Sequence, residues 1–382
     1  MNRIVIVGNG FDLAHGLKSS YHDFVLWLIN EAISKVYSDN NPVHTDFFSI
    51  NPTKSLNSET FTLIESISEY YKDESILRTS NYLFFRINTD TNSNSSISEK
   101  HNITFCITSH LFDTLLKSKN WTDIEKAYFT ILIKISEDKS GVYKETLKKL
   151  NHDFNKLKIK LAEYLVFVEN KLKKPENKSL NDIIHKVDSD MLYKCYSTEI
   201  RNFLINKGGE GNPEKIFYIN FNYTSVLRKV LENFSVKNNS IMNKIVSIHG
   251  NINDPEKIIF GYGDESNSHF RSLEELDIEA YLVNFKSNYY PSNSDYWDLE
   301  GILKLADYEV VVIGHSLGLS DRILFETIFE NENCKFIHLT HTGNDSHFKK
   351  RIALSRHFKD KKKLRSKLVP ESEVLKYDRI SE

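Results

Sequence analysis

An unbroken apolar strand within residues 309–318 constrains the fold more than any other feature of the chain. The segment reads EVVVIGHSLG, so a run of β-branched residues leads directly into a glycine and a polar pair. A strand without alternating polar residues is buried on both faces, as in parallel sheets that helices cover on each side. The pattern predicts an α/β fold. It also places Gly314, His315 and Ser316 at the carboxyl edge of the sheet, where such folds bind ligands.

Further short strands rich in β-branched residues are spread along the chain. They are predicted at residues 3–8, 215–220, 244–249, 257–260, 308–313 and 334–340. Helical patterns lie between several of these strands, and this alternation is typical of a mostly parallel sheet with right-handed crossovers. We therefore expect a doubly wound, Rossmann-like α/β sheet.

Hydrophobic periodicity and loop composition predict how the chain is divided. Apolar residues at helical spacing recur between residues 144 and 174, and a glycine-rich stretch before Pro213 marks the return of the strands. The predicted parts are a sheet core from residues 1–37 and 213–358, a mainly helical insertion at 38–207 with a polar loop near 88–102, and a charged C-terminal tail at 359–382.

The composition limits the compartment and the partners. The chain has 382 residues with 50 Lys+Arg against 52 Asp+Glu, so no basic field points to nucleic acid. Its 3 cysteines lie far apart without metal-ligand spacing, which fits reduced thiols in a cytoplasm. The chain begins with a strand pattern rather than a signal peptide, and no apolar run has the length of a membrane span. We expect a cytoplasmic protein without a membrane, nucleic-acid or metal partner.

The first glycine turn is a candidate ligand-binding element. Residues 8–16 read GNGFDLAHG, directly after a strand and before a predicted helix. Glycines let a backbone approach a phosphate, and a helix amino end favours an anion. Leu13 stands where the dinucleotide fingerprint needs its third glycine, so the match to that motif is incomplete. Nucleotide contact and a plain strand-to-helix turn both stay open, and Asp12 either accepts from a ligand hydroxyl or caps the helix.

Two further strand ends carry polar residues. Residues 219–224 read INFNYT and residues 247–251 read SIHGN, which brings Asn222 and His249 to the same sheet edge. Thr224 is alternatively the N-cap of the next helix, and a lone histidine is more often structural. Because four strand ends of one predicted sheet carry such residues, we favour a functional site.

The late turn also permits a different chemistry. Residues 314–318 (GHSLG) match the G-x-S-x-G nucleophile elbow of the α/β-hydrolases, with Ser316 as the nucleophile. The other members of a triad would then come from Asp321 or Asp345 and from His347 or His357. This interpretation leaves the other strand ends without a role, so it is kept as an alternative.

Taken in order, these motifs resemble the AbiH family of bacterial abortive-infection proteins. The strongest match is GNGFDLAHGL at residues 8–17, followed by Tyr21 and Phe24. The match continues through WTDIE at residues 121–125, FNYT at 221–224, IHG at 248–250, and GHSL at 314–317 with Asp321. The resemblance covers nearly the whole chain apart from about residues 38–110. It implies a bacterial protein that acts in antiviral defence.

The motif order is also similar, more weakly, to sirtuin-like NAD-binding domains. Asn222 falls on the sirtuin asparagine and His249 on the catalytic histidine. The loop glycines correspond to Gly8 and Gly10, and the late turn corresponds to Gly314 with Ser316.

The chain departs from that pattern at informative positions. Thr224 stands where the sirtuin aspartate belongs, and His315 stands where its threonine belongs. The zinc-binding cysteines of the protein deacylases have no counterpart among the three scattered cysteines. These departures argue against protein deacylation and favour plain cleavage of a glycosidic bond.

The resemblance therefore implies an NAD glycohydrolase, with NAD as the substrate, no metal, and Asn222 and His249 as catalytic residues. The implied substrate-binding residues are Gly8, Asn9, Gly10, Phe11, Asp12, His15, Phe221, Gly250, Gly314, His315, Ser316 and Asp321. A second copy of the chain and a phage-derived trigger are candidate further partners. The alternatives are a non-catalytic nucleotide-sensing or partner-binding defence module and the serine hydrolase.

Overall fold

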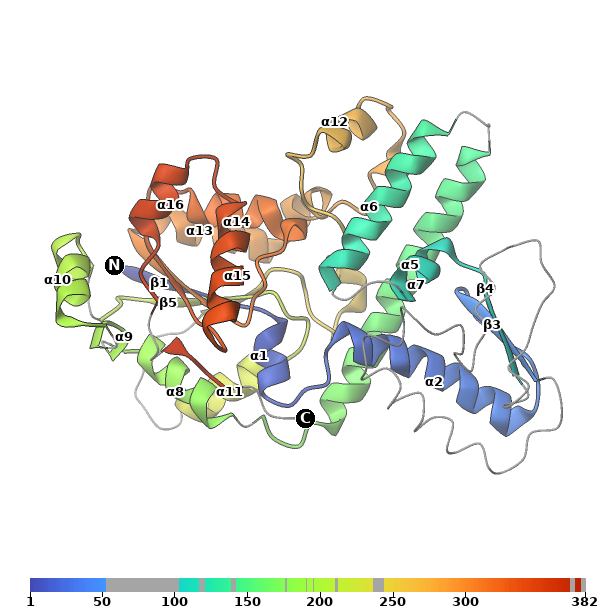
Figure 1. Cartoon of the computed structure of the whole chain (residues 1–382), viewed down its shortest axis with the longest axis horizontal. Helices are drawn as coiled ribbons and strands as arrows, with labels where there is room; N and C mark the ends of the chain where they lie inside the picture. The colour runs from blue at the N-terminus through green and yellow to red at the C-terminus, as the bar shows by residue number, and fades with distance from the viewer. Residues whose placement is uncertain are drawn as a thin grey trace. The chain divides into compact units, whose positions relative to one another are not determined.

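The structure, a computed structural model, describes residues 1–52, 103–116, 121–138, 142–175, 177–189, 191–194, 196–209, 212–235, 244–371 and 375–378. The chain divides into two units (Figure 1). The sheet unit consists of Met1–Ser19, Leu165–Ser272 and Asn284–Glu382. The helical unit consists of Ser20–Tyr164 and Leu273–Val283.

A five-stranded sheet forms the centre of the sheet unit. Its strands lie in the order β6-β5-β1-β7-β8, and each neighbouring pair is parallel. The strands are β1 (Asn2–Val7), β5 (Ile216–Asn220), β6 (Lys244–Ser247), β7 (Tyr308–Ile313) and β8 (Cys334–Leu339). This sheet confirms the predicted α/β class.

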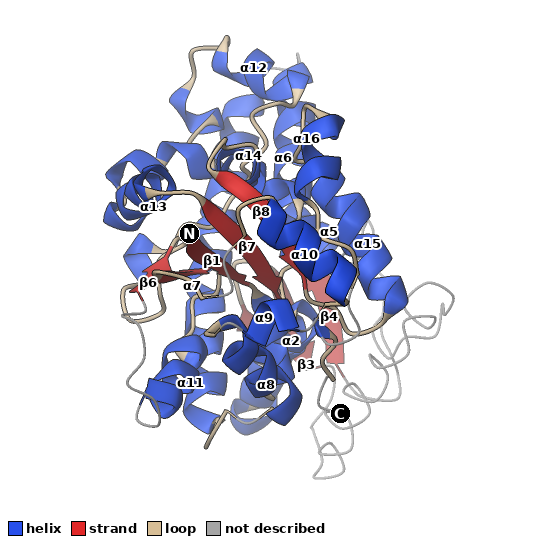
Figure 2. Cartoon of the chain, turned by 90° about the vertical axis from the view of Figure 1, so that its left-hand side faces the viewer, coloured by secondary structure: helices blue, strands red, loops and turns tan. Residues whose placement is uncertain are grey.

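Helices pack against both faces of the sheet, which explains why β1 and β7 lack polar alternation. On one face, Ile4 and Ile6 of β1 share a hydrophobic core with α13 (Ser294–Leu305) and α14 (Arg322–Phe329). On the other face, the segment of α8 (Lys178–Val187) and α9 (Met191–Lys194) bonds to side chains of β1 and β7. Figure 2 shows these two helical layers on opposite sides of the strands.

The chain changes direction across the sheet between β1 and β7. It passes from β1 to β5 and β6 on one side, and then crosses to β7 and β8 on the other side. The connections that follow β1 and β7 therefore lead to opposite halves of the sheet. Open α/β sheets bind ligands outside the carboxyl ends of the strands at such a switch point.

The prediction of a strand at residues 257–260 is wrong. A 3-10 turn at Pro255–Lys257 leads into this segment, and the Ile259 amide donates to the His249 carbonyl at 2.9 Å. The turn takes up Lys257, and the three residues after it lie outside the strands of the sheet.

The helical unit combines helices with a small antiparallel sheet. Its helices are α2 (Tyr21–Asp39), α5 (His110–Leu116), α6 (Trp121–Glu137) and most of α7 (Tyr143–Lys171), which confirms the long helical pattern from residue 144. The sheet has the order β2-β3-β4 and consists of Val43–His44, Phe48–Pro52 and Ile103–Ile107. This sheet was not predicted, because β3 and β4 are far apart in sequence. The polar loop expected near 88–102 lies outside the described residues.

The unit boundaries differ from the predicted domain boundaries. Residues 20–37 group with the helical unit, and residues 165–207 group with the sheet unit. Buried polar bonds explain the second difference. Arg3 of β1 pairs with Glu309 of β7 at 2.6 Å, and it also donates to the carbonyls of Val187 and Ser189. These bonds attach the segment after α8 to the sheet.

The predicted charged tail is largely part of the sheet unit. Within it, α16 (Lys361–Lys367) leads to Val369, whose amide donates to the Ile337 carbonyl of β8 at 3.0 Å. Lys367 is buried and donates to the carbonyls of Phe329 and Asn331 near the end of α14. Lys367 is therefore a structural residue of this segment.

The remaining α-helices of the described residues are α1 (Asn9–Ala14), α10 (Thr198–Asn206), α11 (Val226–Ser235), α12 (Ser268–Glu274) and α15 (Asn344–Ser355). None of the described helices has the length and apolar character that a membrane crossing requires.

Candidate functional site

The predicted motifs meet at the carboxyl edge of the parallel sheet. The segments 8–12, 220–224, 248–250 and 314–316 follow β1, β5, β6 and β7, which are adjacent in the sheet. Parallel strands bring their carboxyl ends to one edge, so segments more than two hundred residues apart become neighbours. The structure thus places both predicted catalytic residues, Asn222 and His249, on this edge.

The two glycine turns lie directly on each other at the switch point. The Gly10 amide donates to the Gly314 carbonyl at 2.8 Å, and the Gly8 amide donates to the Ile313 carbonyl at 3.0 Å. A Cβ on Gly314, whose φ is +66°, would stand 2.3 Å from the Phe11 amide nitrogen. The absence of side chains at Gly10 and Gly314 therefore serves contact between the two loops.

This contact bears on the prediction that the turn amides bind a phosphate. In this conformation the amides of Gly8 and Gly10 donate to carbonyls of the late turn, and the Phe11 amide donates to the Gly8 carbonyl at 2.8 Å. These three donors are already used. An anion would have to displace protein hydrogen bonds in order to bind there.

Asp12 is the centre of a buried polar cluster that joins the first two motifs. Its Oδ1 accepts from Asn222 Nδ2 at 2.8 Å, and its Oδ2 accepts from the Thr224 hydroxyl. Asn222 Nδ2 also donates to the Gly8 carbonyl at 3.2 Å. We call Asp12, Asn222 and Thr224 the Asp12 cluster.

The cluster decides two alternatives that the sequence left open. Asp12 does not cap α1, whose N-cap is Gly8 without a side-chain hydrogen bond. Thr224 is not the cap of α11, because Glu169 accepts from the Ser225 amide at 3.0 Å in front of that helix. Burial raises the pKa of Asp12 to about 7, although both hydrogen bonds oppose this shift. The carboxyl therefore titrates near neutral pH.

His249 belongs to a second buried cluster, with Asp321 and Lys286. Asp321 Oδ1 lies 3.1 Å from His249 Nε2 and accepts from Lys286 Nζ at 2.7 Å. The His249 ring also donates to the Phe221 carbonyl, and the Tyr290 hydroxyl lies 3.5 Å from Nε2. We call His249, Asp321 and Lys286 the His249 cluster.

Charges within this cluster set its protonation. Burial and the Lys286 ammonium lower the pKa of His249, while Asp321 acts in the opposite direction. The Lys286 ammonium and the His249 ring hold the pKa of Asp321 far below its usual range, against the effect of burial. A lowered pKa makes His249 a neutral imidazole at pH 7, which is the form that a general base requires.

His315 lies beside both clusters in an aromatic environment. Its ring centroid is 4.5 Å from Phe221 and 5.0 Å from Phe325, in edge-to-face contacts. Its Nδ1 accepts from the Leu317 amide at 2.9 Å, and burial lowers its pKa to about 3. His315 is therefore neutral at physiological pH, with its remaining proton on Nε2.

The geometry around Ser316 does not form a hydrolase triad. Ser316 is exposed, and the left-handed residues of this turn are Gly314 and Leu317, with φ values of 66° and 58°, rather than the serine. Within the described part of the chain, no histidine bonds to Ser316. His357 bonds to the Leu317 carbonyl, and His347 faces Glu371. Of the two candidate acids, Asp321 is already committed to the His249 cluster, and no contact links Asp345 to Ser316.

A comparison with known protein families identifies the chain. The family model described as "Bacteriophage abortive infection AbiH" matches residues 4–342. The chain belongs to the AbiH family. Membership gives it a role in defence against phage by abortive infection. No curated protein matches the chain significantly.

Three predicted binding residues of this AbiH protein have structural partners instead. Asn9 exchanges hydrogen bonds with Ser19, donating to its carbonyl at 3.0 Å and accepting from its hydroxyl. His15 Nδ1 lies 2.8 Å from the Phe11 carbonyl, and the two rings are in contact with centroids 4.3 Å apart. Asn9, Phe11 and His15 thus hold the turn around α1 through these contacts.

Sequence reasoning missed Lys286 and Tyr290. Both come from the irregular segment between β6 and α13, which carries no motif. Within this segment the Lys286 amide donates to the Tyr262 carbonyl at 3.0 Å, beside Gly261 and Gly263. This bond joins two parts of the segment. The sign of this role is that Lys286 is buried, and burial cannot be read from the sequence.

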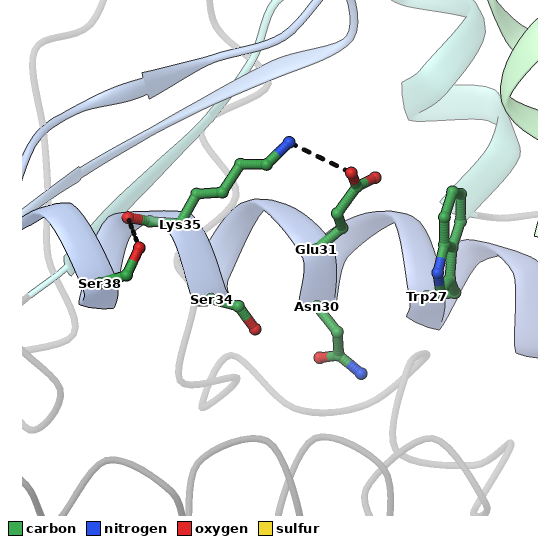
Figure 3. A pocket seen from close by; sticks show the side chains of 6 residues that line it. All are labelled: Trp27, Asn30, Glu31, Ser34, Lys35 and Ser38. Carbon is green, nitrogen blue, oxygen red and sulfur yellow. Dashed lines mark hydrogen bonds and ion pairs between the residues drawn. The ribbon is translucent and has the colours of Figure 1, made fainter. Parts of the chain in front are cut away.

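A separate pocket of about 480 Å³ lies along α2 in the helical unit. It is lined by Trp27, Asn30, Glu31, Ser34, Lys35 and Ser38 (Figure 3). None of the predicted site residues takes part in it. The charged pair Glu31 and Lys35, 3.1 Å apart, lies along its rim as an ordinary i,i+4 ion pair.

Proposed function

We propose that this AbiH protein defends the cell by hydrolysing the nicotinamide–ribose bond of NAD at the carboxyl edge of its sheet. The support is the convergence of four polar strand ends on one switch point, where Asn222 and His249 lie in hydrogen-bonded clusters. The parallel sheet changes direction between β1 and β7, at the kind of edge where α/β folds bind ligands, and the motif order resembles sirtuin-like NAD-binding domains.

The reaction needs groups of the kind that this edge supplies. Nicotinamide leaves as a neutral molecule from a cationic pyridinium, so the bond breaks through an oxocarbenium-like transition state without a metal. Water then attacks the ribose carbon and loses a proton. In the proposal Asn222 orients the ribose and His249 accepts that proton.

The His249 role makes a specific demand on the structure. A neutral ring carries one N–H, and both of its polar neighbours, the Phe221 carbonyl and the ionised Asp321 carboxylate, only accept, so Nε2 can take up a proton only after its contact with Asp321 is broken. That nitrogen faces Asp321 and the Tyr290 hydroxyl, and His249 is only 4% exposed. The reacting water must therefore take the place of Tyr290, so the proposal includes movement of the segment between β6 and α13.

The direct test is release of nicotinamide from NAD by the purified protein. His249→Ala should lower the turnover by roughly 10²–10⁴-fold, the usual span for general acid–base catalysis. Asn222→Ala should cause a loss of similar order if it positions the ribose. A matched control is His152→Ala, since His152 is a half-exposed residue of the helical unit that pairs with Asp46. Full turnover in a folded His249→Ala variant would remove this residue from the mechanism.

The corresponding cellular measurement is the NAD pool after phage challenge. Cells that express the protein should lose NAD, and cells that express His249→Ala should keep it. Intact defence with an unchanged NAD pool would count against NAD cleavage and leave the abortive-infection role in place.

A second candidate function is nucleotide binding without turnover. The observation that favours it over hydrolysis is the engagement of the proposed base, because His249 is 4% exposed and its Nε2 already contacts Asp321. Such a protein would bind NAD or ADP-ribose and change conformation. Binding by calorimetry without release of nicotinamide would support this function over hydrolysis.

A further inference from the structure

We propose that Asp12 is a positioning residue that holds the Asn222 side chain so that its Oδ1 accepts a hydrogen bond from a ligand hydroxyl. This inference rests on the proposed function, in which Asn222 contacts the ribose. Within the Asp12 cluster, Asn222 Nδ2 donates to the Asp12 carboxyl at 2.8 Å and to the Gly8 carbonyl at 3.2 Å.

The two neighbours of the amide nitrogen fix its orientation. A backbone carbonyl can only accept, and an ionised carboxylate can only accept, so the NH₂ group must face both of them. The opposite orientation would bring the amide oxygen against two oxygens. Asn222 Oδ1 consequently points away from Asp12, and within the described residues no donor reaches it.

This orientation selects the chemistry of the ligand. An amide oxygen accepts hydrogen bonds and cannot serve a phosphate, which also only accepts near neutral pH. A sugar hydroxyl is the complementary group. The Asp12 cluster thus specifies the ribose part of a nucleotide at this point of the edge.

Thr224 completes the arrangement from the other side of the carboxyl. Its hydroxyl donates to Asp12 Oδ2, so each carboxyl oxygen has one protein donor. A hydroxyl can also accept, so the same contact survives when Asp12 is protonated. This tolerance matters because burial raises the pKa of Asp12 to about 7.

Asp12 acts through Asn222 rather than on the substrate. The residue is 1% exposed, and both of its oxygens are occupied by Asn222 and Thr224. Asparagine is the conservative replacement, since Asp12→Asn can present its oxygen to Asn222 and its NH₂ to the Thr224 oxygen. Alanine removes both contacts.

The test is a double-mutant cycle on kcat/KM for NAD with the full chain. Asn222→Ala should lower kcat/KM by roughly 10²–10⁴-fold and Asp12→Ala by about 10–100-fold, and the double variant should be within about twofold of Asn222→Ala alone. Asp12→Asn should recover most of the loss. If the losses in kcat/KM of the two single variants add in the double variant, the proposal is overturned. It is also overturned if Asp12→Asn lowers kcat/KM as much as Asp12→Ala, because the carboxyl itself would then take part in the reaction.

A second cycle protects the test against misfolding of Asp12→Ala. Thr224→Val keeps the shape of the side chain but loses the hydroxyl, whereas Thr224→Ser keeps the hydroxyl. Thr224→Val should lower kcat/KM more than Thr224→Ser, and its effect should vanish in the Asn222→Ala background. Equal effects of Thr224→Val with and without Asn222 would contradict the proposal.

Calorimetry with ADP-ribose separates this inference from the proposed function. If the wild type binds ADP-ribose but releases no nicotinamide from NAD, the proposal of NAD hydrolysis is wrong. The same double-mutant cycles, measured on the affinity for ADP-ribose, then test the role of Asp12. If the wild type cleaves NAD and the cycles are additive, the role of Asp12 fails alone. A wild type that neither cleaves NAD nor binds millimolar ADP-ribose overturns both.

Discussion

Asp12 shows how burial changes the chemistry of a single side chain. Its pKa is raised to about 7 from 3.8 because its carboxyl is taken out of water, and Asn222 and Thr224 offset this only in part. A raised carboxyl pKa means that the folded state binds the proton more tightly than the unfolded state. The contribution of Asp12 to stability is therefore greatest below pH 3.8 and is lost as the pH rises to about 7.

This gives a pH-dependent prediction for Asp12→Asn. The wild type should lose roughly 3 kcal/mol of unfolding free energy, relative to Asp12→Asn, between pH 4 and pH 7. The measurement is urea unfolding of both proteins across this range. A constant difference between the two proteins would show that Asp12 ionises with an ordinary pKa.

Ser316 separates hydrolysis of NAD from serine hydrolase chemistry at one atom. In the proposed function Ser316→Ala removes at most one ligand hydrogen bond, about 0.5–1.5 kcal/mol, so NAD binding should weaken by roughly two- to tenfold. Much of the maximal rate should remain. Labelling of Ser316 by a fluorophosphonate probe, together with turnover of an ester, would instead establish the nucleophile elbow.

At the scale of elements, the contact between the two strand-end loops depends on Gly314. Alanine at this position would have a left-handed φ of +66° and a Cβ 2.3 Å from the Phe11 amide nitrogen. We expect Gly314→Ala to lower the unfolding free energy by roughly 2–4 kcal/mol. It should also disturb the hydrogen bond between Gly10 and Gly314.

Gly301 is the matched control within the same unit. It lies in α13, and a Cβ there would meet nothing within 4 Å. Gly301→Ala should raise the unfolding free energy by about 0.5–1 kcal/mol, as expected for an exposed helix position. Similar unfolding curves for the two alanine variants would refute the loop-contact explanation.

At the scale of the whole molecule, buried ion pairs decide which segments group with the sheet. Glu309 of β7 pairs with Arg3 of β1, accepts from Tyr193 at 2.9 Å, and lies 3.1 Å from His338 of β8. Despite burial, the Arg3 guanidinium and His338 lower the pKa of Glu309 to about 2. The same network connects the sheet to the segment of residues 187–196.

A depressed carboxyl pKa stabilises the fold above the pKa of the unfolded state and loses this effect as the pH falls. For Glu309 the loss runs from pH 4.5 down to about 2 and amounts to roughly 3 kcal/mol. Glu309→Gln should be strongly destabilised at pH 7, because Arg3 stays buried without a counter-charge. The difference in unfolding free energy between Glu309→Gln and the wild type should become smaller below pH 4.5. Hydrogen exchange of peptides from β1 and β7 measures the stability of these strands directly. A difference between the two proteins that does not change with pH would contradict the low pKa of Glu309.

The local sequence was sufficient to predict the sheet and its class. Residues 4–7 and 310–313 are continuous runs of β-branched residues, and such runs are typical of strands that are buried on both faces of a parallel sheet. The same logic placed Asn222, His249 and Gly314 at one edge, because parallel strands share their carboxyl ends. Strand-end motifs are local patterns, so they can be recognised without knowing which residues they contact in the folded chain.

Only the tertiary structure decided what these residues do for one another. The glycines of the first turn serve contact with the late turn, Asp12 accepts from Thr224, and Lys286 reaches Asp321 from a segment without a motif. The division of the chain likewise depended on Arg3 and its distant partners. Hydrogen bonds and ion pairs between residues far apart in sequence are set by packing, burial and distance in the folded chain, and none of these quantities is encoded in a local pattern of residues.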